Sequence, residues 1–401
     1  MPFYQATQSA RYLIWRYKMS RPQFEVADVI KQFANEFYTT CKPNGYQRKV
    51  LRALVLCRTP ALGGHKDKCD CCGRERFSYN SCRNRHCPKC QSSRQAFWVE
   101  DLLEATLAVK HYHIVFTIAH ELNAICLLDS KWFYAKLFSC VWDTLRQFGY
   151  THFGVETGAV CVLHTWGQNL SLHPHIHCIV PAAGETLAGN MKHIGGSGKF
   201  LYPVGQLSLV FRGKMMECIK SRLKKQSLPG QYQGIVDTAW KKPWVVFCEP
   251  SLAKPEHVVK YLGQYTHRVA ITNHRILSIH GDSVTFMHKD YGDNARQKPV
   301  NLTGTEFLRR FCMHILPRRF VKIRRYGIYS SRERALKNKQ GLKTKLTVKP
   351  KETVQERIKR LTGFDVYQCP FCKQGTMHTV EVLPRIRSPD YSLAFFLQNQ
   401  G

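Results

Sequence analysis

The stretch HTWGQNLSLHPHIHCIV, residues 164–180, decides how the centre of this chain folds. Its second half is typical of a β-strand, in which successive side chains point to opposite faces of a sheet. His175 and His177 therefore point to one face, and Ile176 points to the other face, into the core. Two histidines on one sheet face can hold a divalent ion and leave positions for water and a phosphate. Gln168 stands seven residues before His175, where a returning strand would supply a third, oxygen ligand.

Strand-like and helix-like segments surround this stretch. The strand-like segments are short, β-rich and bounded by turn residues, and they are residues 111–119, 158–166, 174–181 and 243–249. Helices are predicted over 131–149 and 251–267, and residues 276–288 are typical of a hairpin. This mixture predicts an α+β fold in which helices flank a central, mainly antiparallel sheet.

Two tyrosines on the predicted 251–267 helix are candidate nucleophiles. Tyr261 and Tyr265 are four residues apart, so they lie one turn apart on the same helix face. A phenol is a poor nucleophile at neutral pH, but a phosphate polarised by a metal ion makes its attack feasible. The alternative is an apolar stripe in which both tyrosines pack in the core with Val258 and Leu262.

The cysteines indicate metal binding. The chain has 17 cysteines, many of them two residues apart beside histidines, which is typical of metal ligation in a reducing compartment and not of a disulfide framework. Two Cys-x-x-Cys pairs, separated by 14 residues, predict four thiolates around one structural Zn²⁺; they are Cys69, Cys72, Cys87 and Cys90. Candidates for a second site or for alternative ligands are His65, Cys82, His86, Cys369 and Cys372.

The charge balance predicts a polyanionic partner. Sixty Lys and Arg against 28 Asp and Glu give a net charge of +32, and each neutralised phosphate releases a counterion. DNA is therefore the expected partner, with Tyr326 or Tyr329 as candidates for stacking on bases of a single strand. The basic residues expected to contact DNA are Arg83, Arg85, Lys260, Arg268, Arg318, Arg319, Arg324 and Arg325.

Composition divides the chain into three units. Residues 1–110 are expected to form a helical and zinc-binding DNA-binding domain, with helices over 27–40, 46–57 and about 91–110. Residues 111–300 carry the histidines and tyrosines of the catalytic domain. Residues 301–401 form a basic C-terminal DNA-binding region with one Cys-x-x-Cys knuckle.

Several function classes are not expected. The chain shows no apolar stretch of about 18 residues and no secretory signal, so we expect no membrane partner and a cytoplasmic protein on the bacterial nucleoid. GGSGK at 195–199 resembles a phosphate loop, but His193 and Phe200 occupy positions where that motif needs Gly and Ser or Thr. We therefore expect no use of ATP.

Four segments resemble the IS91 family of rolling-circle insertion-sequence transposases. They are HPHIHCIV at 173–180, KYLGQYTHRVAITNHRI at 260–276, FLRRFCMHILPRRFVKIRRYGIYS at 307–330 and the zinc-region motif SCRNRHCPKCQ at 81–91. The resemblance extends from about residue 30 to residue 377. This family is grouped with the two-tyrosine HUH endonucleases, whose fold places a tyrosine helix over a metal ion on an antiparallel sheet.

The resemblance implies a mechanism. Mg²⁺ or Mn²⁺ is held by His175, His177 and Gln168, with His164 or His173 as alternatives for the third ligand. A tyrosine attacks single-stranded DNA and forms a 5′-phosphotyrosine, and the second tyrosine handles a second strand end. Tyr261 and Tyr265 match the first and second tyrosines of the family.

The resemblance also exposes a departure from related phage initiators, which carry Lys where this chain has Gln264. The partner that stabilises the developing charge is then Lys260, His267 or Arg268.

Two alternatives remain open at this point. A rolling-circle plasmid or phage replication initiator, or a relaxase, shares the nicking chemistry but serves replication or transfer. A zinc-dependent DNA-binding protein without catalysis uses the zinc region and the positive charge alone.

Overall fold

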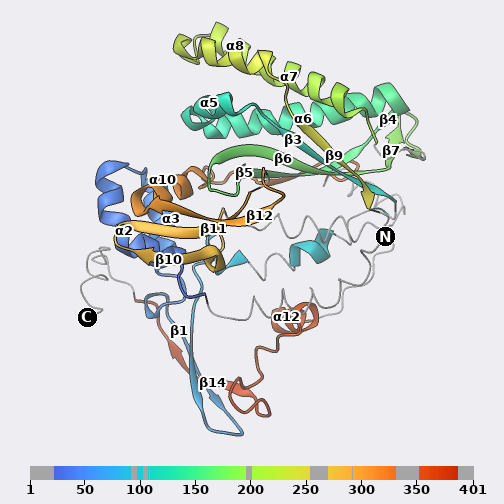
Figure 1. The fold of residues 1–401 in the computed structure, drawn as a ribbon. Coiled ribbons are helices and arrows are strands. Elements are labelled where there is room, and N and C mark those ends of the chain that lie inside the picture. The colour runs from blue at the N-terminus through green and yellow to red at the C-terminus, as the bar shows by residue number, and fades with distance from the viewer. Residues whose placement is uncertain are drawn as a thin grey trace.

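A five-stranded antiparallel sheet lies at the centre of the molecule (Figure 1). The computed structural model describes residues 22–91, 97–102, 107, 109–195, 201–252, 270–290, 292–330 and 352–386. In spatial order the strands are β13 (Ile323–Gly327), β5 (Gly158–Trp166), β6 (Leu172–Pro181), β3 (His111–Thr117) and β9 (Val246–Leu252). This arrangement confirms the central antiparallel sheet predicted from the sequence.

One face of this sheet is covered by helices. Ile114, Leu163 and Ile176 are buried against them, because the apolar half of each alternating strand points that way. The long helix α6 carries an Asp129 N-cap, whose carboxylate accepts from the Trp132 N–H at 3.1 Å, and it ends at a left-handed glycine, Gly154. The helices of this layer are α5 (Asn123–Leu128), α6 (Ser130–Phe153), α7 (Val204–Lys224) and α8 (Gln233–Lys241).

A second core lies beside the central sheet. In it, two N-terminal helices and a helix distant from them in the sequence pack together and against a three-stranded sheet, with Phe33, Phe286 and Phe307 buried at the centre. The helices are α2 (Val26–Thr40), α3 (Gly45–Val55) and α10 (Gly304–Met313), and the strands are β10 (Ile276–His280), β11 (Ser283–Asp290) and β12 (Arg296–Thr303).

A third sheet projects from the molecule and joins distant parts of the sequence (Figure 1). Its order is β14 (Met377–Leu383), β1 (Gly64–Cys69) and β2 (Glu75–Tyr79), so a C-terminal strand pairs antiparallel with an N-terminal one. Helix α12 (Val354–Thr362) precedes β14. Residue 301, where the charge suggested a boundary, is therefore not a packing boundary, since β13, α10 and β14 each join other parts of the fold.

The remaining elements are short. A small sheet contains β4 (Val155–Glu156), β7 (Ala183–Thr186) and β8 (Met191–His193). Four 3₁₀ turns in the described part of the chain are η1 (Pro60–Leu62), η2 (His120–Leu122), η3 (Gly230–Tyr232) and η4 (Asn273–Arg275).

The predicted elements are largely confirmed where the structure describes them. Helices over 27–40, 46–57 and 131–149 and the hairpin over 276–288 are present. The prediction of a helix over 251–267 falls almost wholly on residues 253–269, which lie outside the described residues, and β9 runs on to Leu252. Half of the predicted 91–110 helix also lies outside them, although residues 97–102 are helical. Helix α7 was not predicted.

The helices of the described ranges include none that combines the length and apolar character needed to cross a lipid bilayer. The longest of them, α6, carries charged residues along its length and packs on the central sheet.

The contact between α10 and α2 gives a test of the second core. A Cβ on Gly304 would lie 2.1 Å from the Phe33 ring, so Gly304→Ala must push the two helices apart. We expect Gly304→Ala to lower the free energy of unfolding by about 1–3 kcal/mol, measured by urea denaturation. Gly45→Ala, in α3 with nothing within 4 Å, is the matched control and should cost nothing. Equal losses in both variants would contradict this packing.

Candidate functional site

Three histidines converge on the face of the central sheet that points away from α6 and α7. His164 of β5 is paired directly with His175 of β6, and His177 follows on the same face. The ring centres of His164 and His177 lie 4.4 Å apart, and those of His175 and His177 lie 4.9 Å apart. One ligand nitrogen from each of the three lies within 4.8 Å of the others. Of the two histidines named as alternatives for the third ligand, the register therefore brings His164 to the predicted pair.

Hydrogen bonds orient two of these rings. The Nδ1 of His175 lies 2.7 Å from the His173 carbonyl oxygen, and because a carbonyl can only accept, Nδ1 carries the proton and Nε2 keeps its lone pair. His177 Nδ1 lies 2.8 Å from Nε2 of His113 on β3, and the two rings meet edge to edge, with an interplanar angle of 3°. When His177 donates in this bond, its own Nε2 is also a lone-pair nitrogen. His113 was not singled out in the sequence.

Burial keeps the imidazole rings of His175 and His177 neutral. Burial, followed by the neighbouring His173, lowers the pKa of His175 to about 4. Burial, followed by the charge of His175, holds the pKa of His177 well below its ordinary value. Neutral imidazoles are the form that binds metal ions, so these side chains are ready to act as ligands at neutral pH.

A cavity of about 510 Å³ opens over the three histidines. Its wall comes from β3, from the β5–β6 connection, from β9 and from β11. Gln168 is among the lining residues, and its backbone carbonyl accepts a hydrogen bond from the Arg275 guanidinium. The assignment of Gln168 as a metal ligand therefore stays a prediction. His164 already supplies a third nitrogen ligand beside His175 and His177.

The candidate nucleophiles lie outside the described residues. Tyr261 and Tyr265 fall within 253–269, as do Lys260, His267 and Arg268. The described residues on either side of this segment adjoin the cavity: Phe247 of β9 lines it, and Arg275 bonds to Gln168. The role of the tyrosines stays a prediction.

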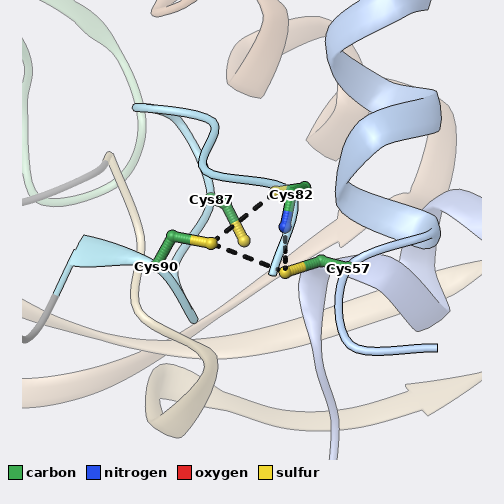
Figure 2. A group of neighbouring side chains, drawn as sticks. All are labelled: Cys57, Cys82, Cys87 and Cys90. Carbon is green, nitrogen blue, oxygen red and sulfur yellow. Dashed lines mark hydrogen bonds between the residues drawn. The ribbon is translucent and has the colours of Figure 1, made fainter. Parts of the chain in front are cut away.

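One cysteine cluster holds the end of α3 against the 82–90 loop (Figure 2). It consists of Cys57, Cys82, Cys87 and Cys90. The sulfur of Cys90 lies 3.5 Å from that of Cys57 and 3.7 Å from that of Cys82, and the Cys82 N–H points at the Cys57 sulfur at 3.4 Å. Hydrogen bonding from Cys82 and Cys87 lowers the pKa of Cys57 to about 7.

The second cluster consists of Cys69, Cys72, Cys369 and Cys372. The prediction that one site contains Cys69, Cys72, Cys87 and Cys90 is therefore wrong, because the two predicted pairs belong to different clusters. Spacing along the chain missed Cys57, which has no cysteine within three residues, and it left Cys369-x-x-Cys372 as half a site.

The two histidines proposed as alternative ligands lie outside both clusters. His65 Nε2 lies 3.4 Å from an Asp67 carboxylate oxygen. His86 accepts a hydrogen bond from Arg85 at 3.4 Å, and burial lowers its pKa to about 3. His65 and His86 belong to neither of the two cysteine clusters.

Known proteins resemble this chain over most of its length. The family described as "transposase zinc-binding domain" matches residues 29–118, and the family described as "putative transposase" matches residues 158–337. The protein named "Putative transposase y4qJ" of Sinorhizobium fredii (strain NBRC 101917 / NGR234) is 38% identical over 393 residues, which cover 92% of this chain and 98% of that protein.

A more distant relative carries the name of an insertion sequence. The "Transposase for insertion sequence element IS801" of Pseudomonas savastanoi pv. phaseolicola is 23% identical over 350 residues, 82% of each chain. The chain belongs to the IS91 family of insertion-sequence transposases. No solved structure matches it. The resemblance drawn from the sequence is confirmed, DNA is the partner on which a transposase acts, and the zinc-binding family contains the whole first cysteine cluster.

The basic residues of the transposase fall into two groups. Arg83, Arg318 and Arg319 are exposed. Arg85 instead donates to the Pro317 carbonyl at 2.9 Å, and the Arg324 guanidinium lies 4.3 Å from the centre of the Phe138 ring. Arg85 and Arg324 thus contact other parts of the protein. Contact with DNA phosphates stays a proposal for the exposed Arg83, Arg318 and Arg319.

The remaining candidates for DNA contact lie on β13 and just after it. Arg325 is half-buried on this strand. Tyr329 is buried with its hydroxyl on His111, and Tyr326 stacks on Trp142 at 5.1 Å between ring centres. The expectation that Tyr329 stacks on DNA bases is therefore wrong, and the same expectation for the partly buried Tyr326 stays a prediction.

Buried histidines predict an acid-sensitive fold. Burial lowers the pKa of His314 to about 4, and its Nε2 bonds to the Leu170 carbonyl at 3.1 Å. An unfolded histidine has a pKa of about 6.5, so between pH 6.5 and 4 the unfolded chain binds more protons and stability falls as the pH falls. We expect His314→Gln to flatten the slope of unfolding free energy against pH by up to about 1.4 kcal/mol per pH unit. The measurement is urea denaturation from pH 7.5 to 5.

His120→Gln is the matched control, because the side chain of His120 is 77% exposed. This variant should keep the wild-type slope. A slope for His314→Gln equal to that of wild type would show that His314 titrates alike in both states.

Proposed function

We propose that this transposase nicks and rejoins single-stranded DNA at insertion-sequence ends through a 5′-phosphotyrosine, in rolling-circle transposition. The proposal gives the central sheet the role of an HUH endonuclease domain. The observation that carries it is the convergence of three imidazoles, from His164, His175 and His177, beneath an open cavity. Sheet-borne histidines beside a space for phosphate suit metal-assisted phosphoryl transfer.

The side chains at this place fit a divalent ion. Three imidazole nitrogen donors lie within 4.8 Å of one another, and the Gln168 side chain could add an oxygen donor from the cavity wall. When bound, Mn²⁺ or Mg²⁺ supplies positive charge that polarises a phosphate and stabilises the charge that develops on it. Imidazole donors suit Mn²⁺ better than Mg²⁺, which prefers oxygen ligands, so we expect Mn²⁺ to be the more effective ion.

The chemical step belongs to the tyrosines. The phenolate oxygen of Tyr261 or Tyr265 forms a bond to the scissile phosphorus, and the bond from phosphorus to the 3′ oxygen breaks. The leaving oxygen takes up a proton and becomes a 3′-OH. The phosphotyrosine bond conserves the energy needed for rejoining, so no ATP is required, and the second tyrosine accepts a second strand end.

The cavity wall offers groups that suit a single strand. Phe247 is 52% exposed at the sheet edge and lines the cavity, so its ring is open for stacking on a base. Lys289 of β11 lines the same cavity and is exposed, which suits contact with a backbone phosphate. We propose that Lys289 supplies positive charge in a chain that has Gln264 where phage initiators have Lys.

Metal dependence is the first test. His164→Ala and His177→Ala should abolish Mn²⁺-dependent cleavage of labelled single-stranded oligonucleotides that carry the element's own ends. His113→Ala should weaken activation by Mn²⁺ about 10–100-fold, because it removes the hydrogen bond that orients His177. Cleavage is followed on denaturing gels across a Mn²⁺ titration.

His193→Ala, an exposed histidine on β8 outside the cavity wall, is the matched control and should cleave as wild type does. Full cleavage by His164→Ala and His177→Ala would remove the support for a metal centre here.

Covalent capture is the second test and separates this proposal from a DNA-binding protein without catalysis. With the same oligonucleotides and Mn²⁺, wild type should form a protein–DNA adduct that survives denaturation. The double variant Tyr261→Phe, Tyr265→Phe should form none while still binding DNA in a mobility-shift assay. Each single variant then identifies the tyrosine that attacks first. Unchanged adduct formation in the double variant would refute the phosphotyrosine step.

A further inference from the structure

We propose that Cys69, Cys72, Cys369 and Cys372 form a second zinc centre, which joins the two ends of the described chain. Cys72 and Cys369 are 297 positions apart, yet their sulfurs lie 3.7 Å from each other. The sulfurs of Cys69 and Cys372 are also 3.7 Å apart, and all four lie within 4.8 Å. The match to the zinc-binding family ends at residue 118, so that family contains only half of this ligand set.

The two cysteine pairs have the same backbone geometry. In the first, the Cys69 N–H donates to the Arg74 carbonyl at 3.0 Å and the Gly73 N–H donates to the Cys69 carbonyl at 3.1 Å. In the second, the Cys369 N–H donates to the Gly375 carbonyl at 2.9 Å and the Lys373 N–H donates to the Cys369 carbonyl at 3.0 Å. Each pair is thus a tight knuckle.

The residue after each knuckle adopts the left-handed conformation. Gly73 has φ of +69° and Lys373 has φ of +60°. Lysine rarely adopts this conformation, and its presence shows that the second turn is fixed by its surroundings. Two knuckles that face each other with four cysteines form the arrangement of a zinc ribbon.

Backbone N–H groups point at the sulfurs. The Cys72 N–H lies 3.4 Å from the Cys69 sulfur, and the Gly375 N–H lies 3.4 Å from the Cys372 sulfur. Hydrogen bonds of this kind favour the thiolate, which is the form that binds zinc.

The knuckles are packed too closely for any side chain at Gly375. A Cβ there would lie 2.6 Å from the Cys69 sulfur and 2.5 Å from the Cys71 Cβ. Glycine is therefore required where the C-terminal knuckle crosses the N-terminal one. The sulfur separations are far longer than the roughly 2.05 Å of a disulfide, and all four cysteines are free thiols.

Protein contacts bring the two halves together beside the proposed ion. Strand β14 pairs with β1 so that Met377 is opposite Cys69, where β1 ends. The Asp70 carboxylate accepts from the Thr376 N–H at 2.8 Å, and Asp67 accepts from the Thr379 hydroxyl at 2.9 Å. The site is therefore assembled by the sheet, and zinc would lock it.

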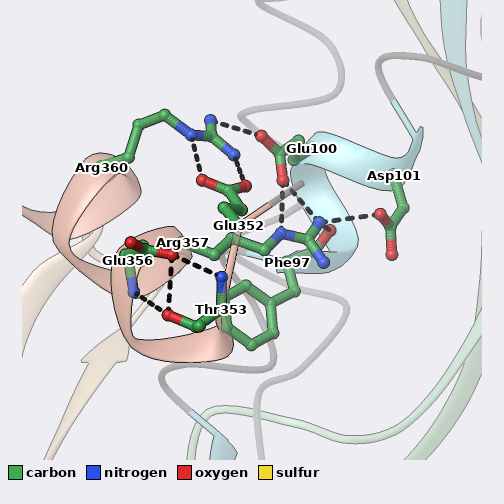
Figure 3. Close-up of polar contacts among 8 residues, drawn as sticks. All are labelled: Phe97, Glu100, Asp101, Glu352, Thr353, Glu356, Arg357 and Arg360. Atoms are coloured by element: carbon green, nitrogen blue, oxygen red, sulfur yellow. Dashed lines mark hydrogen bonds and ion pairs between the residues drawn. The ribbon is translucent and has the colours of Figure 1, made fainter. Parts of the chain in front are cut away.

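A second attachment holds the same C-terminal segment (Figure 3). The Arg357 guanidinium of α12 donates to Glu100 at 2.6 Å and to Asp101 at 2.8 Å, and Arg360 forms an ion pair with Glu100 at 2.6 Å. These acids lie in the helical residues 97–102, which follow the first cysteine cluster. Residues 352–386 are thus attached to N-terminal residues at two places, the ion pairs of α12 and the proposed zinc centre. A chelator would open only the zinc centre.

Zinc content of the purified full chain tests the proposal. Elemental analysis of wild type should find two zinc ions per chain, one for each sulfur cluster. The double variant Cys369→Ser, Cys372→Ser should retain one. Cys41→Ser, an exposed cysteine outside both clusters, is the matched control and should retain two. One zinc ion in wild type, or two in the double variant, would overturn the proposal.

Alkylation under native conditions shows which cysteines are protected, and it separates loss of the site from loss of the fold. In the double variant, Cys69 and Cys72 should become reactive while the cysteines of the first cluster stay protected. Mass spectrometry of wild type, denatured without reductant, should find no disulfide among the four. Disulfides in place of zinc there would refute the centre. Because zinc content does not depend on cleavage, this result is independent of the proposed nuclease activity.

Discussion

The hydrogen-bond register between β5 and β6 is the constraint on which the candidate metal centre depends. It sets His164 opposite His175 and Val162 opposite His177. A slip of one residue would turn His164 to the opposite face of the sheet, because side chains alternate with a period of two. The register is enforced from that other face, where Leu163 and Ile176 are paired and buried against the helices. Burying each such side chain contributes about 1.5–3 kcal/mol, so the core of the central sheet also positions its histidines.

The same alternation of side chains places a further histidine beside the three candidate ligands. His113 of β3 lies on the face that carries His177. It is two residues before Val115, which is the residue of β3 paired with His177. Its ring bonds edge to edge with that of His177, so the orientation of a candidate ligand is held by a strand that supplies no ligand itself. The β10–β12 sheet supplies the far wall of the cavity through β11. The candidate site is thus built from two sheets with separate cores.

The sequence predicted features that depend on short-range periodicity. Alternation around Ile176 is enough to place His175 and His177 on one face, and apolar spacing is enough to find α2, α3 and α6. Features that depend on pairing between distant segments could not be predicted in the same way. The sequence left the third ligand open between Gln168, His164 and His173, and only the strand register sets His164 beside His175. In the sequence, Cys57 looks like an apolar residue at the end of a helix. The ligands of each cluster come from segments that are distant in the sequence, so the spacing between cysteines cannot show which ones meet.

The order in which the chain can assemble follows from the second cysteine cluster. Closing a flexible loop of about 300 residues costs about 5 kcal/mol in chain entropy, which a pair of isolated knuckles would have to overcome alone. In the folded chain most of that cost is already met, because β13 and α10 hold the intervening sequence on the central sheet and on α2. Closure of the cluster Cys69, Cys72, Cys369 and Cys372 is therefore much less costly once both cores have formed. A zinc ion bound there would stabilise complete chains and contribute nothing to a chain that lacks its C-terminal strand, whereas the first cluster lies wholly within residues 57–90 and needs no such long-range closure.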